Sequence, residues 1–293
     1  MKKLFNKILA VFAMILMVLS VLSCTEAVYS PNAVSGDEFT LETAERSAEQ
    51  GNPYAQCALA FMFYHGDYRE LDYEKAFYWF KKSAERGYDF AEYNLGIMYY
   101  NGEGTAQDYE KAFYWFEKSA EQGDVFVQYK LGLMYYWDEG TVQDYEKAVY
   151  WLEKSAEQGY MLGQYALGLM YYNGEGTSQN YEKAFYWFEK SADQGCARAQ
   201  YCLACMYYNG EGTARDYEKA FYWCKKSAEQ GIAYAQYDLG MMYCCGDGVE
   251  QNDTESMYWF KCAVSQGRED YKNTLKEFEV RMLCYPPIYI DLD

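Results

Sequence analysis

The chain has 293 residues, of which 51% are hydrophobic, so it can bury a sizeable core. Its formal net charge is −18. So acidic a chain repels phosphate backbones, and this excludes ordinary nucleic-acid binding, which needs clustered lysine and arginine.

The amino terminus has the order of an export signal. Lys2, Lys3 and Lys7 precede an apolar run over residues 8–22. At about 1.5 Å per residue this run covers roughly 22 Å, which is less than the ~30 Å hydrocarbon core of a membrane. We therefore expect residues 1–23 to be a signal peptide rather than a permanent membrane span.

Val21-Leu22-Ser23-Cys24 resembles a bacterial lipobox, although Leu22 stands where that motif usually has a smaller residue. The resemblance implies that Cys24 is lipidated and that the chain is exported and anchored at the outer membrane, because Thr25 rather than aspartate follows. The alternative is cleavage after Ala27, which would release a periplasmic or secreted protein. Residues 24–38 are polar and predict a flexible tether.

A repeat of 36 residues organises the rest of the chain. Its closing glycine recurs without slippage at Gly51, Gly87, Gly123, Gly159, Gly195, Gly231 and Gly267. A fixed period of this length is typical of arrays that bury their core between neighbouring units.

The first half of each repeat predicts a helix, here called helix A, exemplified by residues 90–100. Ala91, Leu95 and Met98 have the spacing of one helix face. Residues 101–107 follow with two glycines in four residues, which predicts a turn that needs positive φ. Tyr68 replaces the second loop glycine in the first repeat, and Trp137-Asp138 replaces Asn-Gly in the third, so we expect these two loops to differ in shape.

The second half predicts helix B. An Asp or Asn such as Asp108 caps its start, and Ala112, Trp115, Phe116 and Ala120 give an apolar face. The closing glycine suits the left-handed position after a helix. In helix A, glycine recurs at residues 96, 132, 168 and 240, and alanine replaces it at 60 and 204. Because glycine inside a helix is unfavourable, this pattern indicates close packing of A on B.

These patterns predict an all-α fold, a right-handed α/α superhelix of 36-residue helix-turn-helix repeats. Residues 53–267 hold six repeats. Residues 39–52 predict an amino-terminal capping helix, and residues 268–293 a degenerate capping helix with a tail, since terminal units of solenoids are atypical.

The repeated pattern Ala-x-x-x-Leu-Gly-x-Met-Tyr-x-x-Gly-x-Gly, then Lys-Ala-x-x-Trp-Phe-x-Lys-Ser-Ala-x-Gln-Gly, closely resembles the Sel-one-like repeat (SLR) family, which is related to tetratricopeptide repeats. The resemblance covers residues 42–267. It implies a concave face lined largely by helix A, and a role as an adaptor or scaffold for other proteins.

The chain offers little catalytic chemistry. The single histidine, His65, is expected in a solvated loop, and no Gly-x-Ser-x-Gly or Ser-x-x-Lys motif accompanies it. The Gly-x-Gly loops lack the lysine of a phosphate-binding loop. We therefore expect no catalytic, cofactor-binding or metal-binding residues.

Of the ten cysteines, Cys57, Cys205 and Cys224 replace Tyr93, Ile97 and Phe116 of the second repeat and are expected to act as small core residues. A single structural disulfide is an alternative. Cys202-x-x-Cys205 has the spacing of a redox or metal motif, but it lies in the middle of a predicted helix.

A stripe along helix A changes in every repeat, while the packing positions stay constant. Aromatic and Arg side chains with adaptable polar neighbours are typical of recognition surfaces. We expect this stripe to bind a peptide or protein, the alternative being unconstrained drift. Its candidate residues are Phe90, Asn94, Asn101, Phe126, Lys130, Trp137, Asn173, Arg198, Asn209, Tyr234 and Asp238.

The sequence thus favours a non-catalytic scaffold at a bacterial cell envelope that binds protein partners and no cofactor. Two alternatives are a cell-wall or β-lactam hydrolase, which some relatives of the resembled family suggest, and a peptidoglycan or carbohydrate binder with stacking tyrosines.

Overall fold

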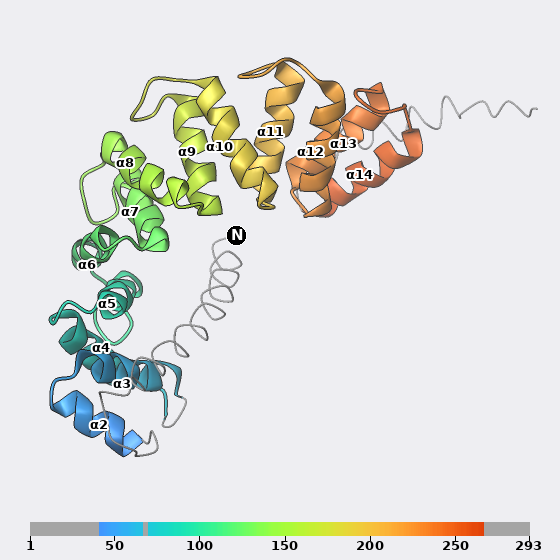
Figure 1. The fold of residues 1–293 in the computed structure, drawn as a ribbon. Coiled ribbons are helices and arrows are strands. Elements are labelled where there is room, and N and C mark those ends of the chain that lie inside the picture. Colours follow the sequence, from blue (N-terminus) through green and yellow to red (C-terminus); the bar gives the residue numbers. More distant parts are fainter. Residues whose placement is uncertain (1–40, 67–69, 267–293) are drawn as a thin grey trace, which may run out of the picture. The chain divides into compact units, whose positions relative to one another are not determined.

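The computed structural model describes residues 41–66 and 70–266, and within them every regular element is a helix (Figure 1). The helices are α2 (Leu41–Glu49), α3 (Pro53–His65), α4 (Tyr73–Ala84), α5 (Asp89–Asn101), α6 (Tyr109–Glu121), α7 (Val125–Trp137), α8 (Tyr145–Glu157), α9 (Met161–Asn173), α10 (Tyr181–Asp193), α11 (Ala197–Asn209), α12 (Tyr217–Glu229), α13 (Ala233–Cys245) and α14 (Asp253–Ser265).

Several predicted segments lie outside the described residues. They are the signal peptide at 1–23, Cys24 with the tether at 24–38, Tyr68, and the capping helix and tail at 268–293. Within the predicted amino-terminal segment 39–52 the structure has the helix α2.

The chain forms two compact units, one up to Gln143 and one from Asp144. In the first unit each helix from α2 to α6 packs against the helix that follows it, and in the second the same holds from α8 to α13. Within each unit, helices A and B alternate in sequence and contact their sequence neighbours. The predicted all-α solenoid of helix-turn-helix repeats is confirmed.

Local chemistry sets the ends of the helices as the sequence indicated. Asp108 has extended backbone and its Oδ1 accepts a hydrogen bond from the Lys111 amide at 3.0 Å, which begins α6. Gly102 follows α5 in the left-handed conformation, with φ 75°. The Asp108 amide donates to the Tyr99 carbonyl at 2.9 Å, so the loop between α5 and α6 is closed at its base.

The core consists of the predicted small and apolar faces. Ala91, Leu95 and Met98 of α5 are fully buried, and Phe116 of α6 is 1% exposed. A Cβ atom at Gly96 would lie 2.7 Å from the Phe116 ring, so the glycine provides the seat for this ring. The packing need inferred from the helical glycines is therefore confirmed.

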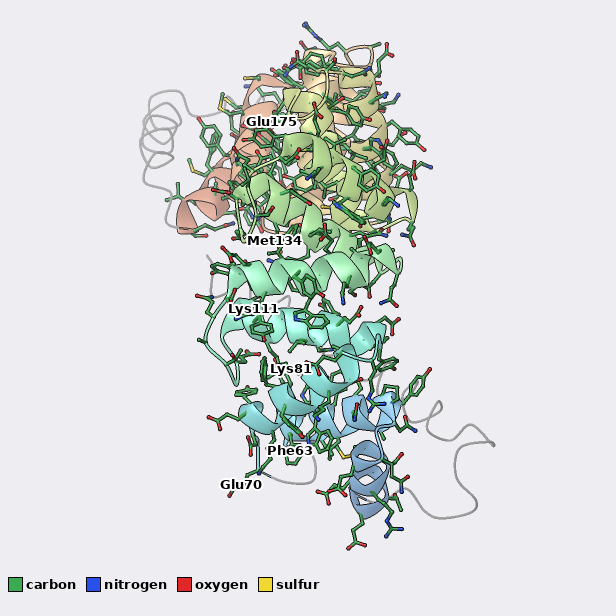
Figure 2. The ribbon with its side chains drawn as sticks, turned by 90° about the vertical axis from the view of Figure 1, so that its left-hand side faces the viewer. Phe63, Glu70, Lys81, Lys111, Met134 and Glu175 are labelled. Carbon is green, nitrogen blue, oxygen red and sulfur yellow. The ribbon has the colours of Figure 1, made fainter. Side chains whose placement is uncertain are left out.

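Figure 2 shows how the side chains divide between core and surface. Phe63 and Met134 are buried, whereas Lys81 and Lys111 are exposed on their B helices. Trp115 departs from the prediction because it is half-buried rather than part of the core.

The loop of the third repeat does not differ as expected. Asp138 adopts φ 60° and ψ 38°, close to the 75° and 36° of Gly102. The Glu139 amide bonds the Met134 carbonyl at 3.1 Å, as in the other loops. Aspartate is one of the few residues that tolerate this conformation, so the same turn forms without glycine.

Two contacts that the sequence did not predict fix the positions of the helices. Gly104 lies so close to the start of helix B of the preceding repeat that a Cβ atom would collide with the Tyr73 carbonyl. The buried Ser191 Oγ donates to the Met161 carbonyl at 2.8 Å, which joins α10 to the start of α9 within one repeat. The second glycine of the loop is therefore part of the interface between repeats, and the serine of helix B joins the two helices of one hairpin.

Candidate functional site

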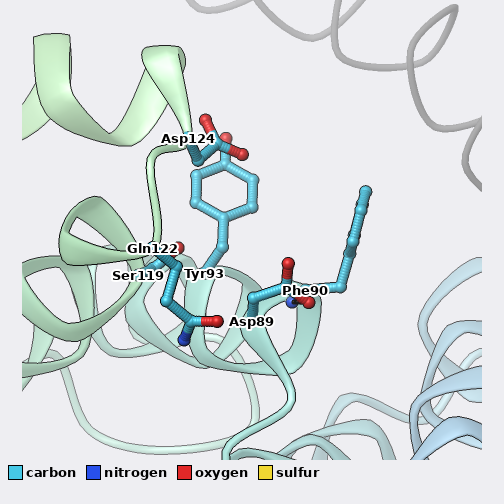
Figure 3. Close-up of a pocket in the computed structure, with 6 residues that line it drawn as sticks. All are labelled: Asp89, Phe90, Tyr93, Ser119, Gln122 and Asp124. Carbon is cyan, nitrogen blue, oxygen red and sulfur yellow. Dashed lines mark hydrogen bonds between the residues drawn. The ribbon is translucent and has the colours of Figure 1, made fainter.

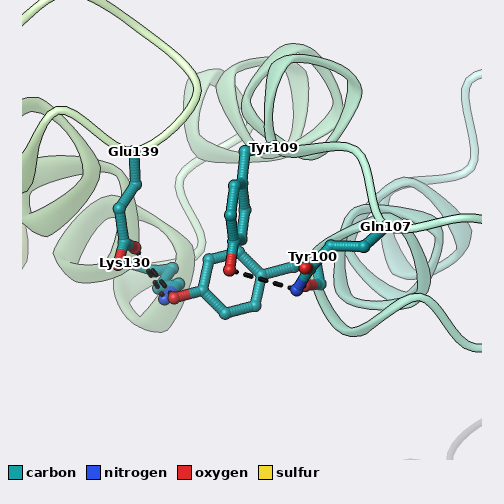
Figure 4. Close-up of polar contacts among 5 residues, drawn as sticks. All are labelled: Tyr100, Gln107, Tyr109, Lys130 and Glu139. Atoms are coloured by element: carbon teal, nitrogen blue, oxygen red, sulfur yellow. Dashed lines mark hydrogen bonds and ion pairs between the residues drawn. The ribbon is translucent and has the colours of Figure 1, made fainter.

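A ladder of tyrosines connects helices α3, α5, α9 and α11 to the loop of the repeat that follows each of them. The Tyr100 hydroxyl donates to Glu139 Oε2 at 2.8 Å, and equivalent bonds join Tyr64 to Glu103 and Tyr172 to Glu211 (Figure 4). The burial of Tyr100 and its bond to the Glu139 carboxylate raise the pKa of this phenol. The tyrosines at this position are thus occupied in stacking the repeats.

Lys130 belongs to the same cluster, although it was predicted to face a partner. Its Nζ lies 3.7 Å from the centre of the Tyr100 ring and 3.8 Å from Glu139 Oε2 (Figure 4). Burial lowers the pKa of Lys130, and the charge of Glu139 opposes this shift. Both internal contacts engage the charged end of the side chain.

The remaining predicted residues of the first unit differ in their exposure. Asn94 is buried and its Nδ2 donates to the Phe90 carbonyl at 2.6 Å, so its side chain is used within α5. Phe126 is 37% exposed and Trp137 is 63% exposed. Asn101 is also exposed, at the end of α5.

A small pocket of about 170 Å³ lies near the start of α5 and is lined by Asp89, Phe90, Tyr93, Ser119, Gln122 and Asp124 (Figure 3). Its carboxylates already have structural roles, because Asp124 Oδ1 accepts from the Phe126 amide at 2.8 Å and Asp89 Oδ1 from the Phe90 amide at 2.8 Å. In Figure 3 the Phe90 ring points away from the other lining residues. The pocket gives no clear binding chemistry.

In the second unit the predicted residues lie on three helices. Asn173 of α9 and Arg198 and Asn209 of α11 are exposed. Tyr234 and Asp238 of α13 are half-buried, and the Tyr234 ring lies 4.4 Å from the Tyr201 ring of α11.

Two of these predicted residues, Asn209 and Asp238, line a larger cavity of about 310 Å³. We call it the α11–α13 cavity, because α11, α12 and α13 enclose it with the start of the following loop. Its lining residues are Tyr201, Ala204, Cys205, Tyr208, Asn209, Ala220, Cys224, Asp238, Met241, Met242, Cys245 and Asp247.

This cavity lies where the fifth repeat departs from the core packing of the others. Phe116, Phe188 and Phe260 each fill the corresponding place against a helical glycine. In the fifth repeat Cys224 replaces the phenylalanine and Ala204 replaces the glycine, and both line the cavity. Because an alanine methyl group and a thiol are together much smaller than a phenyl ring, the exchange leaves space.

The polar groups of the α11–α13 cavity are arranged in pairs. The Tyr201 hydroxyl donates to Asp238 Oδ2 at 2.7 Å, and the Tyr208 hydroxyl donates to Asp247 Oδ2 at 3.0 Å. Burial raises the pKa of Asp238, an effect that the Tyr201 hydrogen bond opposes. Burial also raises the pKa of the Cys205 thiol to about 11, so this thiol is protonated and unreactive at neutral pH.

The cysteines of the described residues include six free thiols, Cys196, Cys202, Cys205, Cys224, Cys245 and Cys262. Cys57 and Cys224 are buried core residues as predicted, whereas Cys205 is only half-buried and lines the cavity. Residues 41–66 and 70–266 contain no cluster of three or more His, Cys, Asp or Glu suited to a metal ion.

His65 does not lie in a loop, contrary to the prediction. It is the last residue of α3, and its ring stacks on Phe61 with 6.0 Å between ring centres. Helix A continues to the residue before the left-handed Gly66, so the turn begins later than the sequence suggested. No helix in the described part of the chain has the length and apolarity needed to cross a membrane.

Sequence reasoning identified Cys224 as a core substitution but missed the cavity it creates. The sequence did contain a signal for this cavity. Residues 204 and 224 are both exchanged in the fifth repeat, and they correspond to the glycine and phenylalanine that contact each other in other repeats. The tyrosine ladder was also missed, because a tyrosine and a glutamate 39 residues apart in sequence show their pairing only in the stacked structure.

Comparison with known proteins agrees with this architecture. The Sel1 repeat family model matches residues 53–88, 89–124, 125–160, 162–196, 197–232 and 233–267. No curated protein matches the sequence significantly.

The solved structures similar to the chain include two other proteins with the same repeat. One is a protective antigen of uropathogenic Escherichia coli strains with an SLR fold, which is 36% identical in sequence and superposes with a TM-score of 0.76. The match covers 81% of this chain but only 51% of that protein. A Sel1 repeat protein from Oxalobacter formigenes shares 30% identity at a TM-score of 0.64, over 78% of this chain and all of that protein. With six matched repeats and these two relatives, the chain belongs to the Sel1 repeat family.

Proposed function

We propose that this protein is a non-catalytic adaptor that binds protein partners through the variable side chains of its A helices, at a bacterial cell envelope. Sel1 repeats typically mediate interactions between proteins. The observation that carries the proposal is the exposure of large side chains at variable positions, with Trp137 63% and Phe126 37% exposed on α7. Exposed aromatic anchors of this kind contribute most to the affinity of many interfaces.

The envelope location rests on the amino-terminal sequence. A signal peptide followed by Cys24 supports export and lipid anchoring, since several acyl chains would hold the chain on a membrane. The similar Escherichia coli protein is described as a protective antigen, which is compatible with a place at the cell surface. Mass spectrometry of the purified mature amino terminus tests the anchor: an acylated Cys24 supports it, and an unmodified terminus after Ala27 contradicts it.

The partner surface can be tested by crosslinking in living cells. A photoreactive amino acid at residue 126 or 137 should capture a discrete partner that the same group at residue 114 does not capture. Residue 114 is a matched control, because Tyr114 is also an exposed aromatic, at 49%, but lies on helix B.

A second arm uses substitutions in place of crosslinkers. Phe126→Ser combined with Trp137→Ser should abolish capture by the affinity-tagged protein, and a cooperative melting curve confirms that the variant still folds. Capture that survives this double substitution but is lost on Tyr114→Ser would assign the partner surface to helix B and refute the proposal. Lys130 is left unchanged because of its internal contacts.

A further inference from the structure

We propose that the α11–α13 cavity binds a cationic side chain, lysine or arginine, of the protein partner. This inference rests on the adaptor function proposed above and names the chemistry that one of its surfaces recognises. The cavity combines an apolar interior with two carboxylates, which matches the apolar stem and charged head of these two side chains.

The size and lining of the cavity fit a single side chain. Its volume of about 310 Å³ is at the lower end of the range for ligand pockets. Ala204, Ala220, Cys224 and Met242 are all at most 5% exposed and form the apolar part. Methylene groups placed against these residues would be removed from water, which is favourable.

The charge of the cavity selects a cation. Asp238 and Asp247 each accept a hydrogen bond from a neutral tyrosine hydroxyl, and among the described residues no ion pair joins either carboxylate to a lysine or arginine. A partly buried carboxylate without a countercharge is unfavourable, and an ammonium or guanidinium group would offset that cost with a charge-assisted hydrogen bond. The rings of Tyr201 and Tyr208 line the same space and also attract cations.

The combination of residues that lines the cavity distinguishes the fifth and sixth repeats from the others. At the position of Asp238 the other repeats have Ala58, Asn94, Lys130, Ala166 and Cys202. A carboxylate therefore occurs at this position only next to the repeat in which Cys224 replaces phenylalanine. The space and the Asp238 carboxylate therefore coincide in the same place, although neither is needed to build a repeat. Asp247 is the loop carboxylate that Tyr208 bonds, as Tyr100 bonds Glu139.

Two variants remove the two features separately. Cys224→Phe with Ala204→Gly restores the pair found as Phe116 with Gly96, and so fills the space with a ring that three sister repeats accommodate. Asp238→Asn with Asp247→Asn keeps the shape and removes the charge. Glu157→Gln with Glu182→Gln is the matched control, because it removes two exposed carboxylates outside the cavity.

The assay measures binding of the full-length protein to an array of short acetylated and amidated peptides. The central residue is lysine, arginine, norleucine or glutamate, in otherwise identical mixtures of flanking residues. The wild type and the control variant should prefer lysine or arginine over norleucine, and both cavity variants should lose about ten- to a hundredfold in affinity for the cationic peptides. Unchanged melting curves by circular dichroism confirm that the variants fold.

The opposite results are equally clear. Equal binding of norleucine and lysine would show that the cavity takes an apolar side chain. A cationic preference that persists in both cavity variants would show general attraction to an acidic surface. Either result, and equally an array that binds nothing, refutes the cationic site. The adaptor function is decided separately, by the capture of a partner in cells through residues 126 and 137.

Discussion

Replacing Glu92 by glutamine should stabilise the protein at neutral pH. The other five repeats have glutamine at this buried position, and each Nε2 donates to a carbonyl at the end of the preceding helix B, as in the 3.0 Å bond from Gln56 to Ala48. Glu92 is only 3% exposed, and its ionised carboxylate has no proton to donate to the corresponding Ala84 carbonyl. It does accept a 2.6 Å hydrogen bond from Gln122.

The magnitude follows from these contacts. A restored buried hydrogen bond contributes about 1 kcal/mol, and removal of a buried charge adds to it, while the charge-assisted bond from Gln122 becomes weaker. We therefore expect a net gain of about 1–2 kcal/mol in the free energy of unfolding. For a chain of this size that corresponds to roughly 2–6 °C in melting temperature.

The gain should depend on pH. Burial raises the pKa of Glu92 above its ordinary value of 4.5, so its protonated form favours the folded state. The wild type therefore loses stability as pH rises from about 4.5 through the raised pKa, and Glu92→Gln removes this loss. The advantage of the variant should be largest near neutral pH and should shrink at acidic pH.

Thermal unfolding followed by circular dichroism at both pH values measures this difference. The reverse change, Gln164→Glu in the second unit, should lower stability at neutral pH by a similar amount, because Gln164 makes the equivalent bond to Ala156. A Glu92→Gln protein that is less stable than the wild type, or equally stabilised at both pH values, would refute the reasoning.

Three further changes test one contact between repeats, one contact within a repeat and one buried tyrosine. Gly104→Ala should lower the free energy of unfolding by more than about 2 kcal/mol, because the added methyl group collides with a backbone carbonyl. Gly123→Ala is the control: this residue has φ 103° but open space around it, so the change should cost only about 1 kcal/mol of backbone strain. Urea unfolding measures both values. Ser191→Ala should cost about 1 kcal/mol in the same assay, since it removes the hydrogen bond between the buried serine and the Met161 carbonyl. Burial, with the nearby Asp124 charge, raises the pKa of Tyr93 to about 12, so the stability that Tyr93 contributes should fall as pH rises from about 10 to 12. Tyr93→Phe should lose less stability over this range than the wild type does, and an equal loss in the two proteins would contradict this.

The sequence predicted the fold well because the repeat makes packing visible as periodicity. The close contact at Gly96 could be inferred because glycine is otherwise unfavourable inside a helix. The first residues of the B helices could be inferred from the Asp and Asn residues that cap them. Ser191 was missed because serine usually indicates surface, and only the stacked geometry shows the carbonyl that its hydroxyl reaches.

The candidate site was harder to predict, since variation in sequence does not show where a side chain points. Lys130 and Trp137 lie on the same variable stripe, yet one contacts Tyr100 and Glu139 while the other is exposed. The difference depends on Glu139, a loop residue of the same repeat as Lys130. Glu139 lies close to Lys130 Nζ and also accepts a hydrogen bond from Tyr100, which comes 39 residues earlier in the sequence. Such contacts follow from the stacking of repeats and not from local pattern.

A solenoid can hold a cavity such as that at Cys224 because its stability is distributed among neighbouring contacts. Exchanging a buried phenylalanine for a much smaller residue typically costs about 3–5 kcal/mol, a large fraction of the stability of an ordinary domain. Here the alanine at residue 204 fills part of the space, and helices α9, α10, α13 and α14 keep their own contacts with neighbours. The loss is confined to one interface among several equivalent ones. An array of near-identical repeats can therefore tolerate one repeat whose core is incompletely filled. Because the Asp238 carboxylate lines the space that results, this place is the best candidate for a binding function.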